Sequence, residues 1–134
     1  MSQINQVIKS LSNDKFTIAA KEQNEDSLEL LISSKDFNLV RLKIHNEDVP
    51  ELDGWLLDNE KLHFYFSSTS QADFREYLQA LRTDLILMAS DNSFDVMEYR
   101  TFLGNKRSVL KLSFKPVCSS FEQLTKIPFA SKKI

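Results

Sequence analysis

Glycine is scarce in this chain, since its 134 residues include only Gly54 and Gly104. Glycine lets the backbone adopt a positive φ and approach a ligand closely. The nucleotide and phosphate sites that can be recognised in a sequence need several glycines at fixed spacing, in loops that surround the phosphate groups. Two widely separated glycines exclude motifs of that kind.

Cysteine and long apolar runs are equally scarce. Cys118 is the single cysteine, which excludes an intramolecular disulfide and a zinc site built from several thiolates. The longest uninterrupted apolar run, residues 85–89, is too short to span a bilayer. The first residues lack the basic segment and the apolar run of a signal peptide. We therefore expect a cytoplasmic protein without a membrane-spanning segment.

Histidine is limited to His45 and His63, each on the outward side of an expected strand. No HExxH pattern is present, and exposed histidines on strands are usually solvated. Cys118 paired with either histidine is the one thiol nucleophile to consider, but a single cysteine beside Val117 is more typical of a small buried side chain. We predict no metal, no cofactor and no catalytic residue, and we favour a protein that is not an enzyme.

Charge is unevenly distributed, although the formal net charge is only −2. Residues 1–99 hold 18 acidic and 9 basic side chains, whereas residues 100–134 hold 1 acidic and 8 basic ones. Such asymmetry bears on association with partners and not on the fold. Most of the C-terminal bases come from an expected hairpin and the segment after it: Lys106, Arg107, Lys111, Lys115, Lys126, Lys132 and Lys133.

Alternation of apolar and polar residues predicts strands, and apolar residues three and four positions apart predict helices. Helices are expected after Ser2, as far as Leu11, and from Ser70 to Ser90, the second with a Ser70–Asp73 spacing that resembles a capping box. Strands are expected around residues 16–20, 28–32, 40–44, 62–66, 94–103 and 108–115, followed by a short helix near residues 120–126. Short polar turns between neighbouring strands favour antiparallel pairing.

These elements predict a single α+β domain over residues 1–134. It would contain a curved antiparallel sheet of about six strands, one long helix packed on a face and an N-terminal helix, in the order α-β-β-β-β-α-β-β-α. Gly104 is expected to turn the hairpin of residues 94–115, and Gly54 is interpreted as a flexible hinge beside Trp55. Residues 130–134 are expected to form a loose tail.

An acidic stretch, residues 46–60, surrounds the only tryptophan and is expected to form a long loop. Tryptophan is enriched at the centres of protein interfaces, and acidic side chains steer basic partners. We therefore predict a non-enzymatic protein-binding module of the inhibitor or immunity-protein kind, or of the secretion-chaperone or adaptor kind, whose partner is a protein of basic character. The predicted binding residues are Glu47, Asp48, Glu51, Asp53, Trp55, Leu56 and Leu57.

Three alternatives stay open at this point. Trp55, Leu56 and Leu57 could simply cover an edge of the core, since large apolar residues usually lie inside. A small enzyme or ligand-binding domain would have a pocket between the sheet and the long helix, lined by His63, Tyr65, Tyr99 and Cys118. A nucleic-acid-associated module would use the basic C-terminal hairpin, but Phe114 shares its side of the strand with apolar residues rather than with the lysines, which disfavours nucleic acid as a partner. The oligomeric state is also open.

Overall fold

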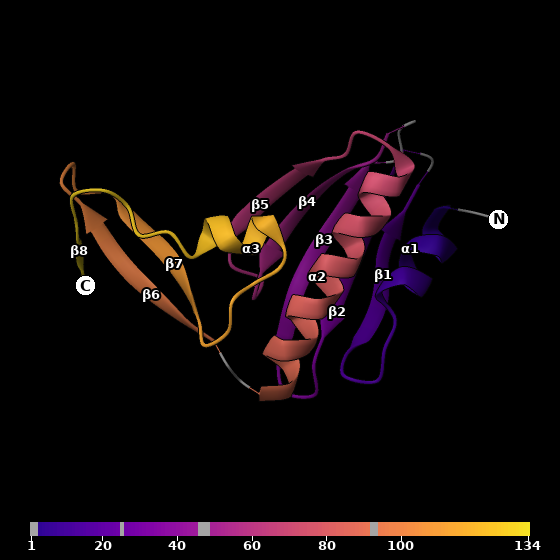
Figure 1. Cartoon of the computed structure of the whole chain (residues 1–134), viewed down its shortest axis with the longest axis horizontal. Helices are drawn as coiled ribbons and strands as arrows, with labels where there is room; N and C mark the ends of the chain where they lie inside the picture. The colour runs from indigo at the N-terminus through magenta and orange to yellow at the C-terminus, as the bar shows by residue number, and fades with distance from the viewer. Residues whose placement is uncertain (1–2, 25, 46–48, 92–93) are drawn as a thin grey trace.

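A five-stranded antiparallel sheet forms the body of the protein in the computed structural model, which describes residues 3–24, 26–45, 49–91 and 94–134 (Figure 1). Its strands lie in chain order, so that each pairs with the next and β1 and β5 are the two edges. The strands are β1 (Thr17–Gln23), β2 (Ser27–Ser33), β3 (Asn38–His45), β4 (Glu51–Leu56) and β5 (His63–Ser67).

Helices cover one face of this sheet. The long helix α2 (Gln71–Asp91) lies across it, and α1 (Gln3–Leu11) lies beside α2 near β1 (Figure 1). The N-terminus of α2 is capped as expected, because Asp73 N–H donates to the Ser70 hydroxyl at 3.0 Å. The Asp73 carboxylate accepts from Thr69 N–H at 2.8 Å, one residue before the cap. None of the described helices is long and apolar enough to cross a membrane.

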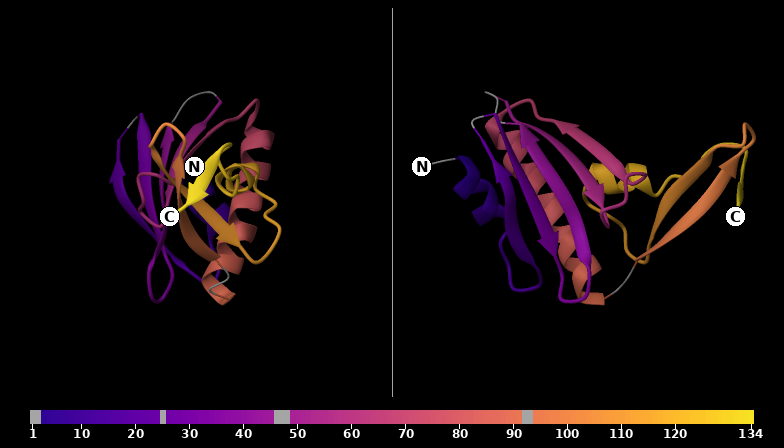
Figure 2. Two further views of the ribbon diagram at one scale, coloured as in Figure 1. Left: turned by 90° about the vertical axis from the view of Figure 1, so that its left-hand side faces the viewer. Right: turned by 180° about the vertical axis from the view of Figure 1, so that it is seen from behind.

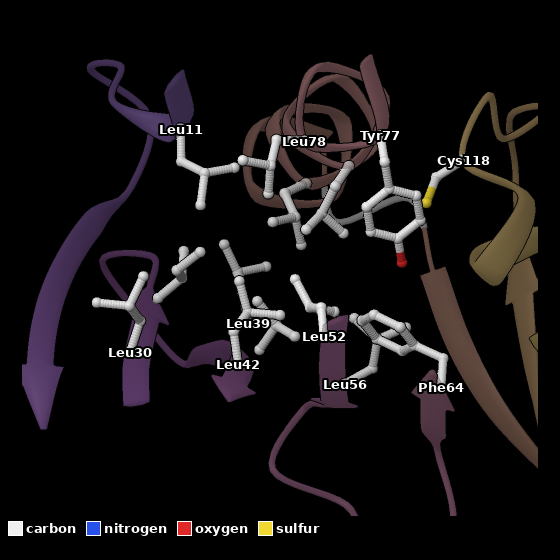
Figure 3. Packing of buried hydrophobic residues seen from close by; sticks show 14 of the residues in the cluster. Leu11, Leu30, Leu39, Leu42, Leu52, Leu56, Phe64, Tyr77, Leu78 and Cys118 are labelled. Atoms are coloured by element: carbon white, nitrogen blue, oxygen red, sulfur yellow. The ribbon is translucent and has the colours of Figure 1, made fainter. Parts of the chain in front are cut away.

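The core is a layer of mainly leucine side chains between the sheet and α2 (Figure 3). Alternate residues of β2, β3 and β4 point into this layer, and α2 contributes residues spaced three and four positions apart. Because strand side chains alternate between faces, burying one face of the sheet directs the other set of side chains to solvent. The fully buried side chains include Leu11, Leu30, Ile32, Leu39, Leu42, Leu52, Leu56, Leu78, Leu81 and Leu85.

A second, three-stranded sheet projects away from the first (Figures 1 and 2). Its order is β7-β6-β8, with β6 (Phe94–Thr101), β7 (Lys106–Leu112) and β8 (Ser131–Lys133). We call this sheet the arm. Helix α3 (Ser119–Leu124) contacts both β5 and β7, so it joins the arm to the body.

The predicted α+β class and the antiparallel pairing are confirmed, but the single sheet of about six strands is wrong in detail. β6 and β7 pair with each other and not with β5, and α3 contacts both β5 and β7. β4 lies within the expected loop, and β8 lies within the expected loose tail. β8 pairs with β6 because the chain reverses near Ala130, which has a φ of +53°, and Tyr99 then lies opposite Lys133.

A buried carboxylate ties the start of α3 to α2. Asp84 is fully buried and accepts hydrogen bonds from the backbone N–H groups of Val117, at 3.0 Å, and Cys118, at 2.8 Å. Burial raises the pKa of Asp84, and these two hydrogen bonds offset part of that rise. Nearby, the buried hydroxyls of Tyr77 and Ser120 lie 2.6 Å apart. These contacts hold α3 at a defined position beside β5.

The two glycines serve different structural purposes. Gly104 has a φ of +87° with open space around it, and it turns the β6–β7 hairpin as expected. Gly54 lies inside β4, where a β-carbon would overlap the ring of Phe64. The interpretation of Gly54 as a flexible hinge is therefore wrong: the residue lets β5 pack its Phe64 ring directly over β4.

We expect Gly54→Ala to destabilise the protein more than Gly104→Ala. The first substitution forces the Phe64 ring to move, at a cost of about 1–3 kcal/mol. The second places a side chain at positive φ, at a cost of about 1 kcal/mol. Urea denaturation of both variants measures the difference. Because the cause at Gly54 is steric, Phe64→Leu should recover part of the loss when combined with Gly54→Ala, and strict additivity of the two changes would contradict this explanation.

Candidate functional site

The uncovered face of the five-stranded sheet carries a group of charged and aromatic side chains. Seen from behind, the strands lie in front and α2 lies behind them (Figure 2). The strand register places Arg41 of β3 opposite Trp55 of β4, and Trp55 opposite His63 of β5. The next outward pair on β4 and β5 is Asp53 and Tyr65. We call these five residues the outward patch.

Arg41 organises the charges of the outward patch. Its guanidinium lies over the Trp55 ring, with Cζ 4.1 Å from the ring centre. It also pairs with three carboxylates: Glu60 at 2.8 Å, Asp58 at 3.2 Å and Glu29 at 3.5 Å. Desolvation lowers the pKa of Arg41, but these carboxylates outweigh it and raise the pKa overall. One cation therefore fixes acidic side chains from β2 and from the β4–β5 turn around a half-buried tryptophan.

Asp53 connects two histidines across β4. Its Oδ1 lies 2.8 Å from Nε2 of His63, and its Oδ2 lies 3.1 Å from Nε2 of His45. Burial by itself raises the pKa of Asp53, but the hydrogen bonds with His45 and His63 outweigh it and bring the pKa below the ordinary 3.8. The His63 ring also contacts Trp55, with 5.1 Å between the ring centres. The imidazoles, the carboxylate and the indole thus form one connected surface.

The two histidines converge, but their geometry differs from that of a metal centre. Each Nε2 is within hydrogen-bonding distance of Asp53, so one nitrogen of each ring is already engaged by this carboxylate. Across the part of the chain that the structure describes, no group of three or more His, Cys, Asp and Glu side chains could hold a metal ion. The arrangement can instead hold rings and charges in fixed positions for contact with another molecule.

Four of the seven predicted binding residues lie on β4 rather than on a loop. Glu51, Asp53 and Trp55 point outward from β4 and are half-buried. Leu56 points inward and is fully buried, so it belongs to the core and not to an exposed binding surface. Leu57 follows β4 with a φ of +56° and is half-buried. The two remaining predicted residues, Glu47 and Asp48, lie outside the described residues.

The loop prediction is wrong for residues 51–56, which form β4 and have the alternating pattern of a strand. Leu52, Gly54 and Leu56 occupy alternate positions and point inward. Gly54 interrupts that apolar alternation, and the surrounding acids resemble a solvated turn. Arg41 and Glu29 were also missed as members of the site, although alternation already placed them on the outward side of their strands. Arg41 and Glu29 are identified as members of the site by the register of strands β2, β3, β4 and β5.

The four residues of the predicted pocket do not converge, so that prediction is wrong. His63 and Tyr65 lie on the outward face of β5, and Tyr99 lies on β6 in the arm. Cys118 lies next to Tyr77 in the core, on the other side of the sheet (Figure 3). Burial raises the pKa of its thiol. Leucine side chains fill the space between the sheet and α2 where the pocket was expected.

The arm carries features that the sequence only partly indicated. Its basic residues flank an aromatic ring, because the register places Tyr99 between Arg107 and Lys133. An apolar hollow of about 380 Å³ is lined by Met97, Val109 and other residues of the arm and the segment after it. Most of the exposed large apolar side chains also belong to the arm and its flanking segments: Phe102, Leu103, Val117, Ile127, Phe129 and Ile134.

Comparison of the chain with protein-family models, with curated proteins and with solved structures finds no match. The geometry of the described surfaces is therefore the basis on which a function can be assigned. Among these, the outward patch has the most side chains held in place by defined contacts.

We expect Asp53→Asn to reduce the free energy of unfolding by about 1 kcal/mol at neutral pH, since that is the usual net contribution of a hydrogen bond to stability. The lowered pKa means that the Asp53 carboxylate contributes its stabilisation above pH 3.8 and loses it as the pH falls through the value in the folded protein. The gap between Asp53→Asn and the unmodified protein should therefore close at pH values well below 3.8.

Urea unfolding across this pH range measures that gap. Asp36→Asn is the matched control, because Asp36 is an exposed turn residue outside the outward patch. A gap for Asp53→Asn that stays constant down to the lowest pH would show that the hydrogen bonds of the Asp53 carboxylate with His45 and His63 do not stabilise the fold.

Proposed function

We propose that this protein acts by binding a partner protein through the outward patch, without chemistry of its own. The observation that carries the proposal is the side-by-side placement of Arg41, Trp55 and Tyr65 on three adjacent strands of an uncovered sheet face. Arginine, tryptophan and tyrosine are the residue types that most often dominate binding energy at protein interfaces. Tyr65 is 50% exposed, so its ring offers contact area that the body of the protein does not use.

The charges around the outward patch favour a basic partner. Glu60 and Asp58 have side chains that are 76% and 52% exposed, and both lie beside Trp55 through their pairing with Arg41. Glu51 lies on the other side, where its carboxylate adds to the effect of desolvation in raising the pKa of Tyr65. Acidic groups at the rim of an interface raise the rate of encounter with a positively charged surface.

Rigidity also supports binding. Arg41 stacked on Trp55, and Asp53 held between two imidazoles, restrict the rotamers of the side chains that a partner would contact. Side chains that are already ordered lose less conformational entropy on association. The buried Cys118 thiol and the hydrogen-bonded histidines offer no comparable support for catalysis. An inhibitor, an immunity protein, or a chaperone or adaptor for a secreted protein is a function of this binding class.

The proposal is tested by capture of partners from the native host on the immobilised protein, comparing the unmodified protein with two variants. Tyr65→Ala and the double change Asp58→Lys with Glu60→Lys should each reduce recovery of the partner about tenfold or more, because they remove a contact residue and reverse the rim charge. Each should leave the thermal unfolding midpoint within a few degrees of the unmodified value, because the side chains are exposed.

Two matched controls test whether the effect belongs to the outward patch. Phe102→Ala removes an exposed ring from the tip of the arm, and Glu76→Lys reverses an exposed charge on α2, on the opposite face of the body. Both should retain the partner. Equal loss of the partner in these controls, or full retention in Tyr65→Ala and in the charge-reversed variant, would contradict the proposal.

A second candidate function, nucleic-acid binding by the arm, is favoured by one observation. Tyr99 lies between Arg107 and Lys133 in the strand register, so an aromatic ring is flanked by cations as in single-strand binding surfaces. If this surface is used, a short single-stranded oligonucleotide should bind at low salt with an affinity that falls steeply as salt rises. Tyr99→Ala should weaken binding by about 1–3 kcal/mol. Absence of binding at low salt would remove this candidate.

A further inference from the structure

β5 is an edge strand, and no strand among the described residues pairs with its outer side. Leu56 N–H donates to the Leu62 carbonyl, and Ser68 N–H donates to the Pro50 carbonyl. Paired residues in an antiparallel ladder alternate between those that exchange hydrogen bonds and those that do not. The backbone groups of Leu62, Phe64, Phe66 and Ser68 therefore point toward β4, while those of the three residues between them point to the open edge: His63, Tyr65 and Ser67.

A groove follows this open edge. It has a volume of about 320 Å³ and lies between β5 and α3, with Phe66 and Tyr65 on one side and Ser120, Gln123 and Leu124 on the other. Both walls are fixed, since Phe64 and Phe121 are in edge-to-face contact with 5.8 Å between their ring centres. The Tyr77–Ser120 hydroxyl contact holds the same helix from the other side. These contacts hold the two walls of the groove together, and the groove lies next to the outward patch.

The other sheet edges carry features that discourage pairing with a further strand, whereas β5 does not. The outer strand β1 contains a register irregularity between Ala20 and Glu22 and an exposed Lys21. The outer strand β7 begins with Lys106 and Arg107 and contains Lys111. The short outer strand β8 contains Lys132 and Lys133. Bulges and lysines are common means of preventing edge-to-edge association. β5 contains no lysine, arginine or proline.

We infer that an extended segment of the partner pairs with the open edge of β5 and becomes a sixth strand of the sheet. The inference rests on the proposed function for the existence of the partner, and it adds how that partner is bound. Hydrogen bonds would form with the backbone of His63, Tyr65 and Ser67. Successive side chains of the added strand would point alternately toward the outward patch and into the groove.

This alternation defines the chemistry of the segment. Its outward side chains would lie next to Tyr65, where the nearest β4 residues are Glu51 and Asp53, so positive charge is complementary. Its inward side chains would lie against Phe66 and Leu124, so small apolar side chains fit. The partner segment is therefore a strand that alternates basic and apolar residues.

The test uses a short fluorescent peptide that alternates lysine and valine, measured by anisotropy against the full chain. Two N-methylated forms of the peptide serve as matched probes. In one form the backbone nitrogen of every lysine is methylated, and in the other the backbone nitrogen of every valine is methylated. If the peptide adds antiparallel to β5, its residues with outward side chains direct their backbone N–H and C=O groups toward β5. If it adds parallel, its residues with inward side chains direct these groups toward β5. Strand addition therefore predicts that one methylated form binds like the parent peptide while the other loses about tenfold or more in affinity.

Failure of the parent peptide to bind overturns the inference. Equal binding of both methylated forms overturns it as well, and so does loss of binding in both. A protein variant checks the site independently: Tyr65→Pro removes an N–H that points to the open edge and none that bonds to β4, and Tyr65→Ala is its control. Only Tyr65→Pro should abolish the difference in affinity between the two methylated forms of the peptide.

The outcomes separate this inference from the proposed function. If charge reversal at Asp58 and Glu60 abolishes partner capture while the peptide ignores N-methylation, the outward patch binds the partner without strand addition and the inference fails. If the peptide pairs with β5 but outward-patch variants retain the partner, the proposed function fails instead. A concentration-dependent dimer that Tyr65→Pro disrupts, without peptide binding, would assign the edge to a second copy of the chain and overturn the inference.

Discussion

Burial of only one face of the five-stranded sheet is the constraint on which the rest of this structure depends. Helices α1 and α2 cover the inward face, and a leucine layer fills the space between. Because strand side chains alternate, inward Leu42 of β3 and inward Leu52 of β4 are each followed by an outward residue that must tolerate water. Arg41, Asp53, Trp55, His63 and Tyr65 occupy those outward positions. The surface that we assign to binding is thus a direct consequence of how the core is built.

Two sets of contacts fix the position of α3 beside β5, at the edge of the sheet. Gly54 allows the Phe64 ring to lie directly on β4, and the same ring then contacts Phe121 of α3. On the other side of α3, Asp84 binds two backbone N–H groups in a buried setting, where leaving those donors unsatisfied would be costly. α3 is therefore held close to β5 without pairing with it. This separation creates the groove beside the open edge.

The outward patch and the β5 edge are parts of one continuous surface. His63 and Tyr65 supply rings to the outward patch through their side chains and free hydrogen-bonding groups to the edge through their backbone. Side-chain contacts would select a basic partner, while backbone pairing would contribute affinity that depends little on sequence. Such a division suits a protein that binds an extended segment. The arm, with its bases and exposed apolar residues, is a separate surface on the far side of α3.

Local patterns in the sequence determined most of the secondary structure and the α+β class. Alternating apolar residues predicted β2, β3 and β5, the Ser70–Asp73 spacing predicted the start of α2, and Gly104 predicted the β6–β7 turn. These features depend on interactions between residues that are near one another in the chain. Periodicity and capping patterns in the sequence reveal such interactions. The acidic segment around Trp55 also predicted part of the surface that we favour, although residues 51–56 of the expected loop form β4.

Only the tertiary structure decided which strands are neighbours, and therefore which side chains meet. Because β2, β3, β4 and β5 pair in this order, Arg41 contacts Trp55, Glu29, Asp58 and Glu60. Asp53 likewise contacts two histidines, one from the strand on each side of β4. The division into two sheets and the open edge of β5 depend likewise on contacts between distant parts of the chain. Register and packing are set by the combined burial of many residues, so no short stretch of sequence could specify them.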